Sequence, residues 1–174
     1  MKTKTITITL YSFKELSEEA QQKAIENLYD LNVNYETYED AERIGLKLTS
    51  FDLDRNRHAK GKILVDHLEM AELIFKEHGK DCDTYKTATE FIKARTALVA
   101  KYSDGKQLDI VDEDKEYDFD QECDELENDF LNSIIEDYSM MLQNEYEYQT
   151  SEEAIIESIE ANEYTFTKDG KLEN

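Results

Sequence analysis

Hydrophobic residues recur with two different periods along the chain, and each period predicts a different kind of element. Residues 3–11 predict a strand, because Ile6, Ile8 and Leu10 alternate strictly with Thr5, Thr7 and Thr9, which is the period of a half-buried strand. Residues 46–54 and 60–66 also alternate and flank a polar segment, so they predict a β-hairpin, and a change of phase near Thr49 predicts a bulge. A further strand is expected near residue 164, just before an Asp-Gly hairpin turn.

Apolar residues at three- and four-residue spacing predict about six helices between these strands. One of them is long, with about 28 residues starting near Asp118, or roughly 40 Å at 1.5 Å per residue. The fold class expected is α+β, a small and mainly antiparallel sheet packed with helices, with one long acidic helix in the C-terminal half. Predicted helix caps and capping boxes are Ser12 with Glu15, Ser17, Asp66 with Glu69, Asp83, and Thr150 with Glu153.

Length and composition predict one domain, residues 1–174, in a soluble and cytoplasmic protein. The chain has 174 residues, 39% of them hydrophobic, which suits one core or at most two small ones. Its apolar runs are far too short for a signal peptide or a membrane span. Cys82 and Cys123 are far apart in the sequence, which favours reduced thiols over a disulfide or a zinc site.

Charge is distributed very unevenly along the chain. Residues 1–100 carry 18 acids and 15 bases, a net charge of −3, whereas residues 101–174 carry 24 acids and 5 bases, a net charge of −19. The expected parts are therefore a near-neutral α+β part (1–103), an acidic connection (104–118) and an acidic helical part (119–174) with a C-terminal hairpin. Such a field repels nucleic acid and anionic membranes, so the expected partner is a basic, nucleic-acid-binding protein.

Acids are densest in residues 109–129, where twelve of twenty-one residues are Asp or Glu. An EF-hand loop that began at Asp112 would need glycine at its sixth position, where the sequence has Tyr117, so no dedicated calcium site is expected. The sequence also has no GxSxG, P-loop or HExxH motif, and its three histidines lack an evident nucleophile partner. We expect neither a metal site, nor a cofactor, nor enzymatic activity.

Several of these acids fall on one face of the predicted long helix. If the apolar stripe faces the core, four carboxylates point the opposite way, at rises of about 10, 6 and 10 Å, which we set beside the few ångströms of axial rise per phosphate along one DNA strand. A solvated face that only serves solubility is the alternative, but unpaired like charges four residues apart cost helix stability and favour a binding role. The predicted partner-binding residues are Asp112, Glu113, Asp114, Glu116, Asp118, Glu125, Asp129 and Glu136.

A cluster of the opposite sign occupies the predicted β-hairpin. Its members are Arg55, Arg57, His58, Lys60 and Lys62. Charges at this place can blunt a sheet edge, pair with acids of the same protein or of a second copy in a homodimer, or contact a phosphate or an acidic partner. The sequence leaves these alternatives open.

Three segments carry a resemblance to a known family. The segments YSFKELSEEAQQKAIE (11–26), LTSFDLDR (48–55) and SEEAIIESIEANEYTFTKDGKL (151–172) resemble a widespread family of small acidic proteins of tailed bacteriophages, mostly uncharacterised and sometimes labelled antitoxin-like. This resemblance implies a phage origin and a cytoplasmic stage in an infected bacterium. It supplies no catalytic residues, and it does not extend to the acidic stretch 109–129.

Together these observations favour a phage-encoded DNA mimic that inhibits a host defence nuclease, of an anti-CRISPR or anti-restriction kind. An antitoxin-like or adaptor protein that neutralises a basic partner through apolar as well as charged surface is the second hypothesis. An enzyme or a metal-dependent factor is the third. Salt dependence separates the first two, because a purely electrostatic contact weakens sharply as salt rises.

Overall fold

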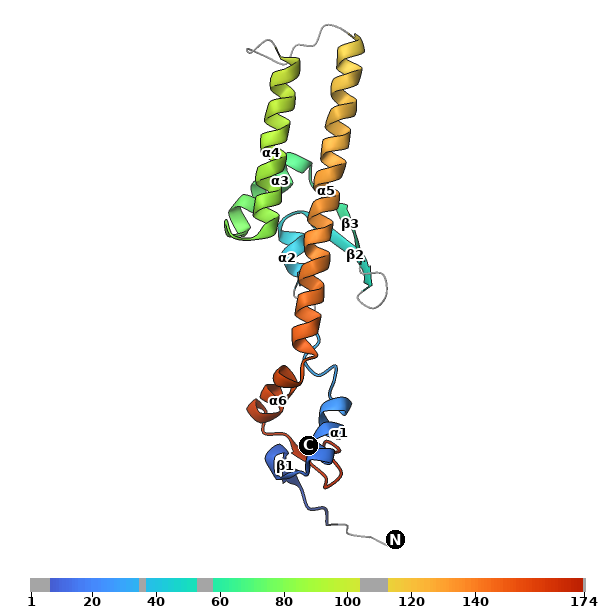
Figure 1. Ribbon diagram of the computed structural model, residues 1–174, viewed down its shortest axis with the longest axis vertical. Coiled ribbons are helices and arrows are strands. Elements are labelled where there is room, and N and C mark those ends of the chain that lie inside the picture. The colour runs from blue at the N-terminus through green and yellow to red at the C-terminus, as the bar shows by residue number, and fades with distance from the viewer. Residues whose placement is uncertain (1–6, 35–36, 53–57, 104–112, 174) are drawn as a thin grey trace, which may run out of the picture. The chain divides into compact units, whose positions relative to one another are not determined.

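The chain folds into two compact units, which Figure 1 shows in a computed structural model. Residues 7–34, 37–52, 58–103 and 113–173 are described, apart from the side chains of Glu113 and Asp114. Unit 1 consists of Met1–Asn34 with Asn144–Asn174, and unit 2 consists of Tyr35–Gln143. Each unit combines helices with an antiparallel strand pair, so the predicted α+β class is confirmed. The expected single domain, residues 1–174, stays a prediction.

The strands form two separate two-stranded ladders among the described residues, β1 with β4 and β2 with β3. The elements in chain order are β1 (Tyr11–Ser12), the 3-10 helix η1 (Phe13–Glu15), α1 (Glu18–Asn27), α2 (Thr37–Arg43), β2 (Leu46–Asp52), β3 (His58–Ile63), α3 (His67–Glu77), α4 (Asp83–Tyr102), α5 (Glu113–Gln149), α6 (Glu152–Ala161) and β4 (Thr165–Phe166).

Unit 1 pairs a segment near residue 11 with a segment near residue 166. β1 pairs with β4, with Tyr11 opposite Phe166, and the chain then turns at Gly170 into a bridge between Phe166 and Leu172, which confirms the predicted Asp-Gly hairpin. Gly170 is required there because its φ is +83° and a Cβ would collide with the Ala20 carbonyl of α1. The apolar faces of α1 and α6 close the core, whose buried side chains include Phe13, Leu16, Ala24, Ile25, Ile155, Ile159 and Phe166.

The predicted strand over residues 3–11 is wrong in its extent. Residues 1–6 lie outside the described residues, and Thr7–Leu10 form no strand. Ile8 and Leu10 are 55% and 46% exposed, although their alternation with threonine is typical of a half-buried strand. The reason is that β4 is only two residues long and pairs only with Tyr11 and Ser12. A strand needs a neighbour, and β4 does not reach these residues.

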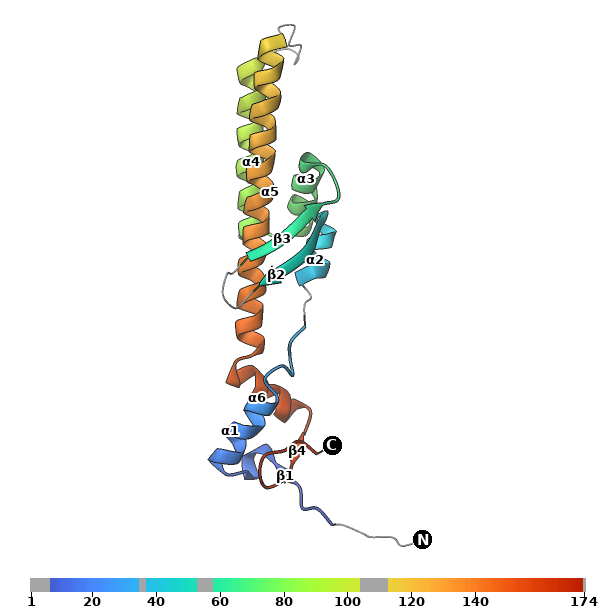
Figure 2. The same cartoon turned by 90° about the vertical axis from the view of Figure 1, so that its right-hand side faces the viewer.

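Unit 2 is organised around the antiparallel pair α4–α5. Figure 2 shows α2, α3 and the β2–β3 ladder on one side of this pair. The predicted hairpin and its bulge are confirmed, since the register of β2 and β3 shifts between Leu48 and Ser50. Asp66 caps α3 as predicted, with its carboxylate accepting from the Glu69 N–H at 2.9 Å. The buried core of unit 2 comprises Ala41, Ile44, Leu46, Leu48, Met70, Ala71, Ile74, Ala88, Phe91, Phe130, Ile134, Tyr138 and Leu142.

Three predicted helix starts are displaced. α5 begins at Glu113, so residues 113–118 of the predicted acidic connection (104–118) are helical. Carboxylates are favourable in the first turns of a helix because they face the positive end of its dipole, which accounts for the earlier start. The N-cap of α4 is Cys82 rather than Asp83, and that of α6 is Ser151 rather than Thr150.

Candidate partner-binding surface

Two acids of α5 that face α4, Glu122 and Glu127, are paired with bases of α4 and hold the two helices together. Glu122 accepts from Lys101 Nζ at 2.6 Å and from the Tyr102 hydroxyl at 2.9 Å, and these hydrogen bonds lower the pKa of its carboxyl. Glu127 accepts from Arg95 Nη1 at 2.8 Å. These acids were not among the predicted partner-binding residues, and their pairing makes them structural.

Burial raises the pKa of two further groups of α5, Asp137 and Tyr138. The Asp137 carboxylate accepts from the Thr87 hydroxyl at 2.9 Å, and desolvation raises its pKa above the ordinary value. The fully buried Tyr138 donates its hydroxyl to Asp40 Oδ2 at 2.8 Å, and burial strongly raises the pKa of the phenol. His78 Nε2 lies 3.3 Å from the same Asp40 oxygen but without hydrogen-bond geometry. This network joins α2, α5 and the end of α3 within the core of unit 2.

The predicted row of carboxylates lies on the exposed side of α5. We call Asp118, Glu125, Asp129 and Glu136 the outer row; all four side chains are exposed. Within the described part of the chain, Asp118, Asp129 and Glu136 make no ion pair or hydrogen bond with another side chain, and Glu125 only accepts from Gln121 at 3.5 Å. The outer row is therefore free to meet a cation from outside.

Of the four other predicted partner-binding residues, the structure describes the side chain of Glu116 alone. Glu116 is exposed on the first turns of α5. Asp112 lies outside the described residues, and Glu113 and Asp114 belong to α5 without described side chains. Sequence reasoning did not include Asp120 and Asp124, which are exposed as well and add to the negative potential of this helix. The sequence contained a signal for these two residues, because an acid occupies every second position from Asp112 to Asp124.

A shallow groove runs between α4 and α5, and sequence reasoning missed it. Its floor is apolar, because the side chains that line it from the two helices are Phe91, Ala94, Leu98, Leu126 and Phe130. The rings of Phe91 and Phe130 stack at 4.2 Å between centroids and close the bottom. Ala94 is exposed and Leu126 is half-buried, so these two side chains supply most of the apolar surface that the floor offers to solvent, whereas Phe91, Leu98 and Phe130 are buried. We call this feature the α4–α5 groove.

The rim of the α4–α5 groove is acidic. Its charged lining residues are Glu90, Glu122, Glu125 and Asp129, and no base is among the described side chains that line it. Glu125 and Asp129 thus belong both to the outer row and to the groove. The outer row therefore borders an apolar surface, whereas the sequence predicted that it would lie directly opposite the core.

The groove lies on the side of α4–α5 that faces away from α3. His67, at the start of α3, contacts Glu127 at 3.1 Å. Glu125 and Asp129 are each two positions from Glu127, and two positions on an α-helix differ by about 200°. The groove is therefore not covered by α3, and the acids on its rim remain accessible.

The predicted basic patch is described only in part. Arg55 and Arg57 lie outside the described residues, whereas His58, Lys60 and Lys62 are exposed on β3. Lys47 of β2, which sequence reasoning did not include, lies directly opposite Lys62 in the ladder. Lys47, Lys60 and Lys62 therefore concentrate positive charge on one face of the hairpin. Like charges that lie opposite each other on paired strands are unfavourable.

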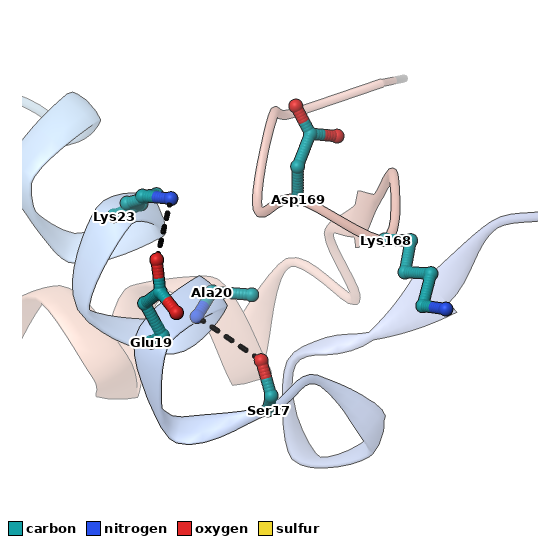
Figure 3. A pocket seen from close by; sticks show the side chains of 6 residues that line it. All are labelled: Ser17, Glu19, Ala20, Lys23, Lys168 and Asp169. Carbon is teal, nitrogen blue, oxygen red and sulfur yellow. Dashed lines mark hydrogen bonds and ion pairs between the residues drawn. The ribbon is translucent and has the colours of Figure 1, made fainter.

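A second concave feature lies in unit 1, where α1 meets the C-terminal hairpin (Figure 3). Two lysines and two acids line it, Lys23 and Lys168 with Glu19 and Asp169, together with Ser17 and Ala20. Glu19 and Lys23 form an ion pair at 3.0 Å, and Ser17 accepts from the Ala20 N–H as the cap of α1. Its charges balance, so it favours neither an anion nor a cation.

Three further features of the described part of the chain concern metal ligands, membrane-spanning helices and cysteines. No group of three or more His, Cys, Asp or Glu side chains there is arranged to hold a metal ion. None of the helices described has both the length and the apolar character needed to cross a bilayer. Cys82 is exposed and Cys123 is buried, and both are free thiols.

Comparison with known proteins adds no relative. No protein-family model, no curated protein and no solved structure matches the chain. The resemblance to acidic phage proteins therefore stays a prediction.

Proposed function

We propose that this chain is an acidic inhibitor that occupies the nucleic-acid groove of a basic partner protein in place of DNA. The partner class we propose is a defence nuclease of a bacterial host, such as a CRISPR effector or a restriction enzyme, and the proposed source is a bacteriophage. The observation that carries the proposal is the outer row, four exposed carboxylates without a basic partner among the described side chains.

The length of the outer row fits this use. Asp118 and Glu136 are eighteen positions apart, which corresponds to roughly 27 Å of helix at 1.5 Å per residue. Along one DNA strand, phosphates follow at about 3.4 Å, so this length corresponds to roughly eight phosphates. A helix also holds its charges without the entropy cost of ordering a loop, which favours binding to a preformed basic groove.

Pairing within the protein separates the acids by role. Glu122 and Glu127 pair with bases of α4 and stabilise the helix pair. The outer row pairs with no base among the described residues, although Glu125 and Asp129 are like charges four positions apart, which disfavours the helix. A solubility role would be served equally well by acids interspersed with bases. A basic partner that neutralises the outer row would explain why the chain keeps like charges that destabilise its helix.

Competition with DNA tests the proposal. The immobilised full chain is incubated with a purified restriction enzyme or CRISPR effector, and bound enzyme is measured as duplex DNA is added. We expect DNA and the chain to exclude each other, because both need the same basic groove. A ternary complex of chain, enzyme and DNA with undiminished nuclease activity, found for every nuclease that binds the chain, contradicts the proposal.

An antitoxin-like or adaptor protein is the second candidate, and the apolar floor of the α4–α5 groove favours it. A partner that does not bind nucleic acid, and whose binding depends weakly on salt, would identify this alternative. Salt distinguishes the two because screening weakens contacts between exposed charges and leaves apolar contacts intact.

A further inference from the structure

The α4–α5 groove combines an apolar floor with an acidic rim, and this combination restricts what can bind there. We infer that the groove binds a basic amphipathic helix, a segment of the partner that packs as a third helix on α4 and α5. The inference rests on the proposed function, because it specifies the partner chemistry that the same surface recognises. It also adds an apolar contact that a pure imitation of DNA would not have.

The floor is suited to apolar side chains. Ala94 is exposed and small, and it lines the groove together with Leu98, Leu126 and the stacked pair Phe91 and Phe130. A small residue between larger ones leaves a depression into which a side chain of a neighbouring helix can insert. Leucine or isoleucine side chains of a partner would bury apolar surface at this point, which is favourable in proportion to the area removed from water.

The rim determines the charge of the partner. Glu90 lies on α4, and Glu125 and Asp129 lie on α5, so acids flank the floor from both helices. None of these three is paired with a base among the described residues. An acidic or neutral segment would leave them facing the apolar part of the complex without compensation, whereas lysine and arginine can bury their stems and reach the carboxylates.

The geometry of the groove favours a helix over an extended segment. Both walls are α-helices, whose backbone groups are already hydrogen-bonded, so an extended segment would find no edge with which to pair. A helix satisfies its own backbone. The α4 residues that line the groove run from Thr87 to Leu98, which is eleven positions or roughly 16 Å, about three turns of a bound helix.

Synthetic peptides test the inference on the full chain. One peptide has about 14 residues, Leu and Lys in a helical amphipathic order, and a second has the same number of lysines with serine in place of leucine. Binding is measured by fluorescence anisotropy at about 0.15 M salt. We expect the amphipathic peptide to bind at least about tenfold more tightly, a difference of about 1.4 kcal/mol.

Variants locate the contact. Ala94→Trp fills the floor, and its matched control is Ala100→Trp, because Ala100 is also exposed on α4 but does not line the groove. We expect Ala94→Trp to lower the affinity for the amphipathic peptide about tenfold, to that of the serine peptide, and Ala100→Trp to leave it unchanged. Thermal unfolding verifies that both variants fold. Methyl NMR of the unchanged chain gives an independent measurement, with peptide-induced shifts expected at Ala94, Leu98 and Leu126.

The outcomes separate this inference from the proposed function. Equal affinities of the two peptides, or peptide-induced shifts away from the groove, overturn the inference. The proposed function is tested independently with Asp118→Asn and Glu136→Gln, because these two residues of the outer row do not line the groove. If that double variant loses nuclease binding while Ala94→Trp retains it, the groove inference fails and the proposed function stands. If Ala94→Trp loses nuclease binding and the double variant retains it, the groove inference stands and the DNA-mimic proposal fails.

Discussion

Removing the Tyr138 hydroxyl should weaken unit 2, and the structure sets the size of the effect. Tyr138→Phe keeps the buried ring and deletes the hydrogen bond of 2.8 Å to Asp40 Oδ2. A hydrogen bond to a charged group contributes about 1.5–3 kcal/mol. The Asp40 side chain is 33% exposed, so water can partly replace the lost donor. We therefore expect a loss of about 1.5 kcal/mol, at the lower end of that range.

Urea unfolding followed by circular dichroism measures this loss. A loss of about 1.5 kcal/mol lowers the urea midpoint by roughly 0.5–1.5 M, given a slope of about 1–3 kcal/mol per molar urea. Tyr117→Phe is the matched control, because Tyr117 is 70% exposed on the same helix. Hydrogen exchange measured by mass spectrometry should place the loss in peptides of unit 2.

A double-mutant cycle with Asp40→Ala examines the same contact directly. If the hydrogen bond is responsible, the two changes are coupled by at least about 0.5 kcal/mol. Additive effects, or a midpoint for Tyr138→Phe no lower than that of Tyr117→Phe, would refute the reasoning.

Three other predictions concern single positions. Burial raises the pKa of the Asp137 carboxyl above the ordinary aspartate value of 3.8, so ionised Asp137 destabilises the fold as the pH rises through that value. Asp137→Asn should therefore raise the free energy of unfolding near pH 7 but not near pH 3, as measured by urea unfolding. Gly170→Ala should destabilise unit 1 by at least roughly 1–3 kcal/mol because of the positive φ, whereas Gly79→Ala, with open space around it, should have little effect on thermal unfolding. Burial also raises the pKa of the Cys123 thiol, so a thiol reagent near pH 8 should modify Cys82 quickly and Cys123 slowly, and equal rates would contradict this.

Features that depend on local chemistry could be predicted from the sequence. The cap at Asp66 and the turn at Gly170 each involve residues within a few positions of one another: the Asp66 carboxylate accepts from a nearby backbone N–H, and the missing Cβ of Gly170 permits its positive φ. The bulge between Leu48 and Ser50 followed from a change in the phase of alternation. These features needed no knowledge of the neighbouring elements.

Features that depend on distant segments could not be predicted. The alternation of Ile8 and Leu10 with threonine gives no information on whether a partner strand reaches them, and β4 does not. The α4–α5 groove exists because Ala94 and Leu126 come from helices that pair in space. A signal for this pairing was present, since Arg95 and Lys101 are bases on the flank of an apolar stripe, where acids of α5 can meet them.

The outer row was predicted correctly as an exposed surface, and its binding role remains a proposal. Its position followed from the period of the helix alone, because Asp118, Glu125, Asp129 and Glu136 are separated by seven, four and seven residues. Its border with an apolar groove depends on α4, which the period of α5 does not reveal.

Neutralising the outer row tests the central claim most directly. The variant carries Asp118→Asn, Glu125→Gln, Asp129→Asn and Glu136→Gln. A control with the same change in net charge neutralises four exposed acids elsewhere, Glu26, Glu72, Asp81 and Glu157. Affinity for a nuclease that the unchanged chain inhibits is measured across a series of salt concentrations. The account predicts that the outer-row variant loses most of its affinity and its salt dependence, whereas the control retains both; equal affinity and equal salt dependence in the two variants would contradict it.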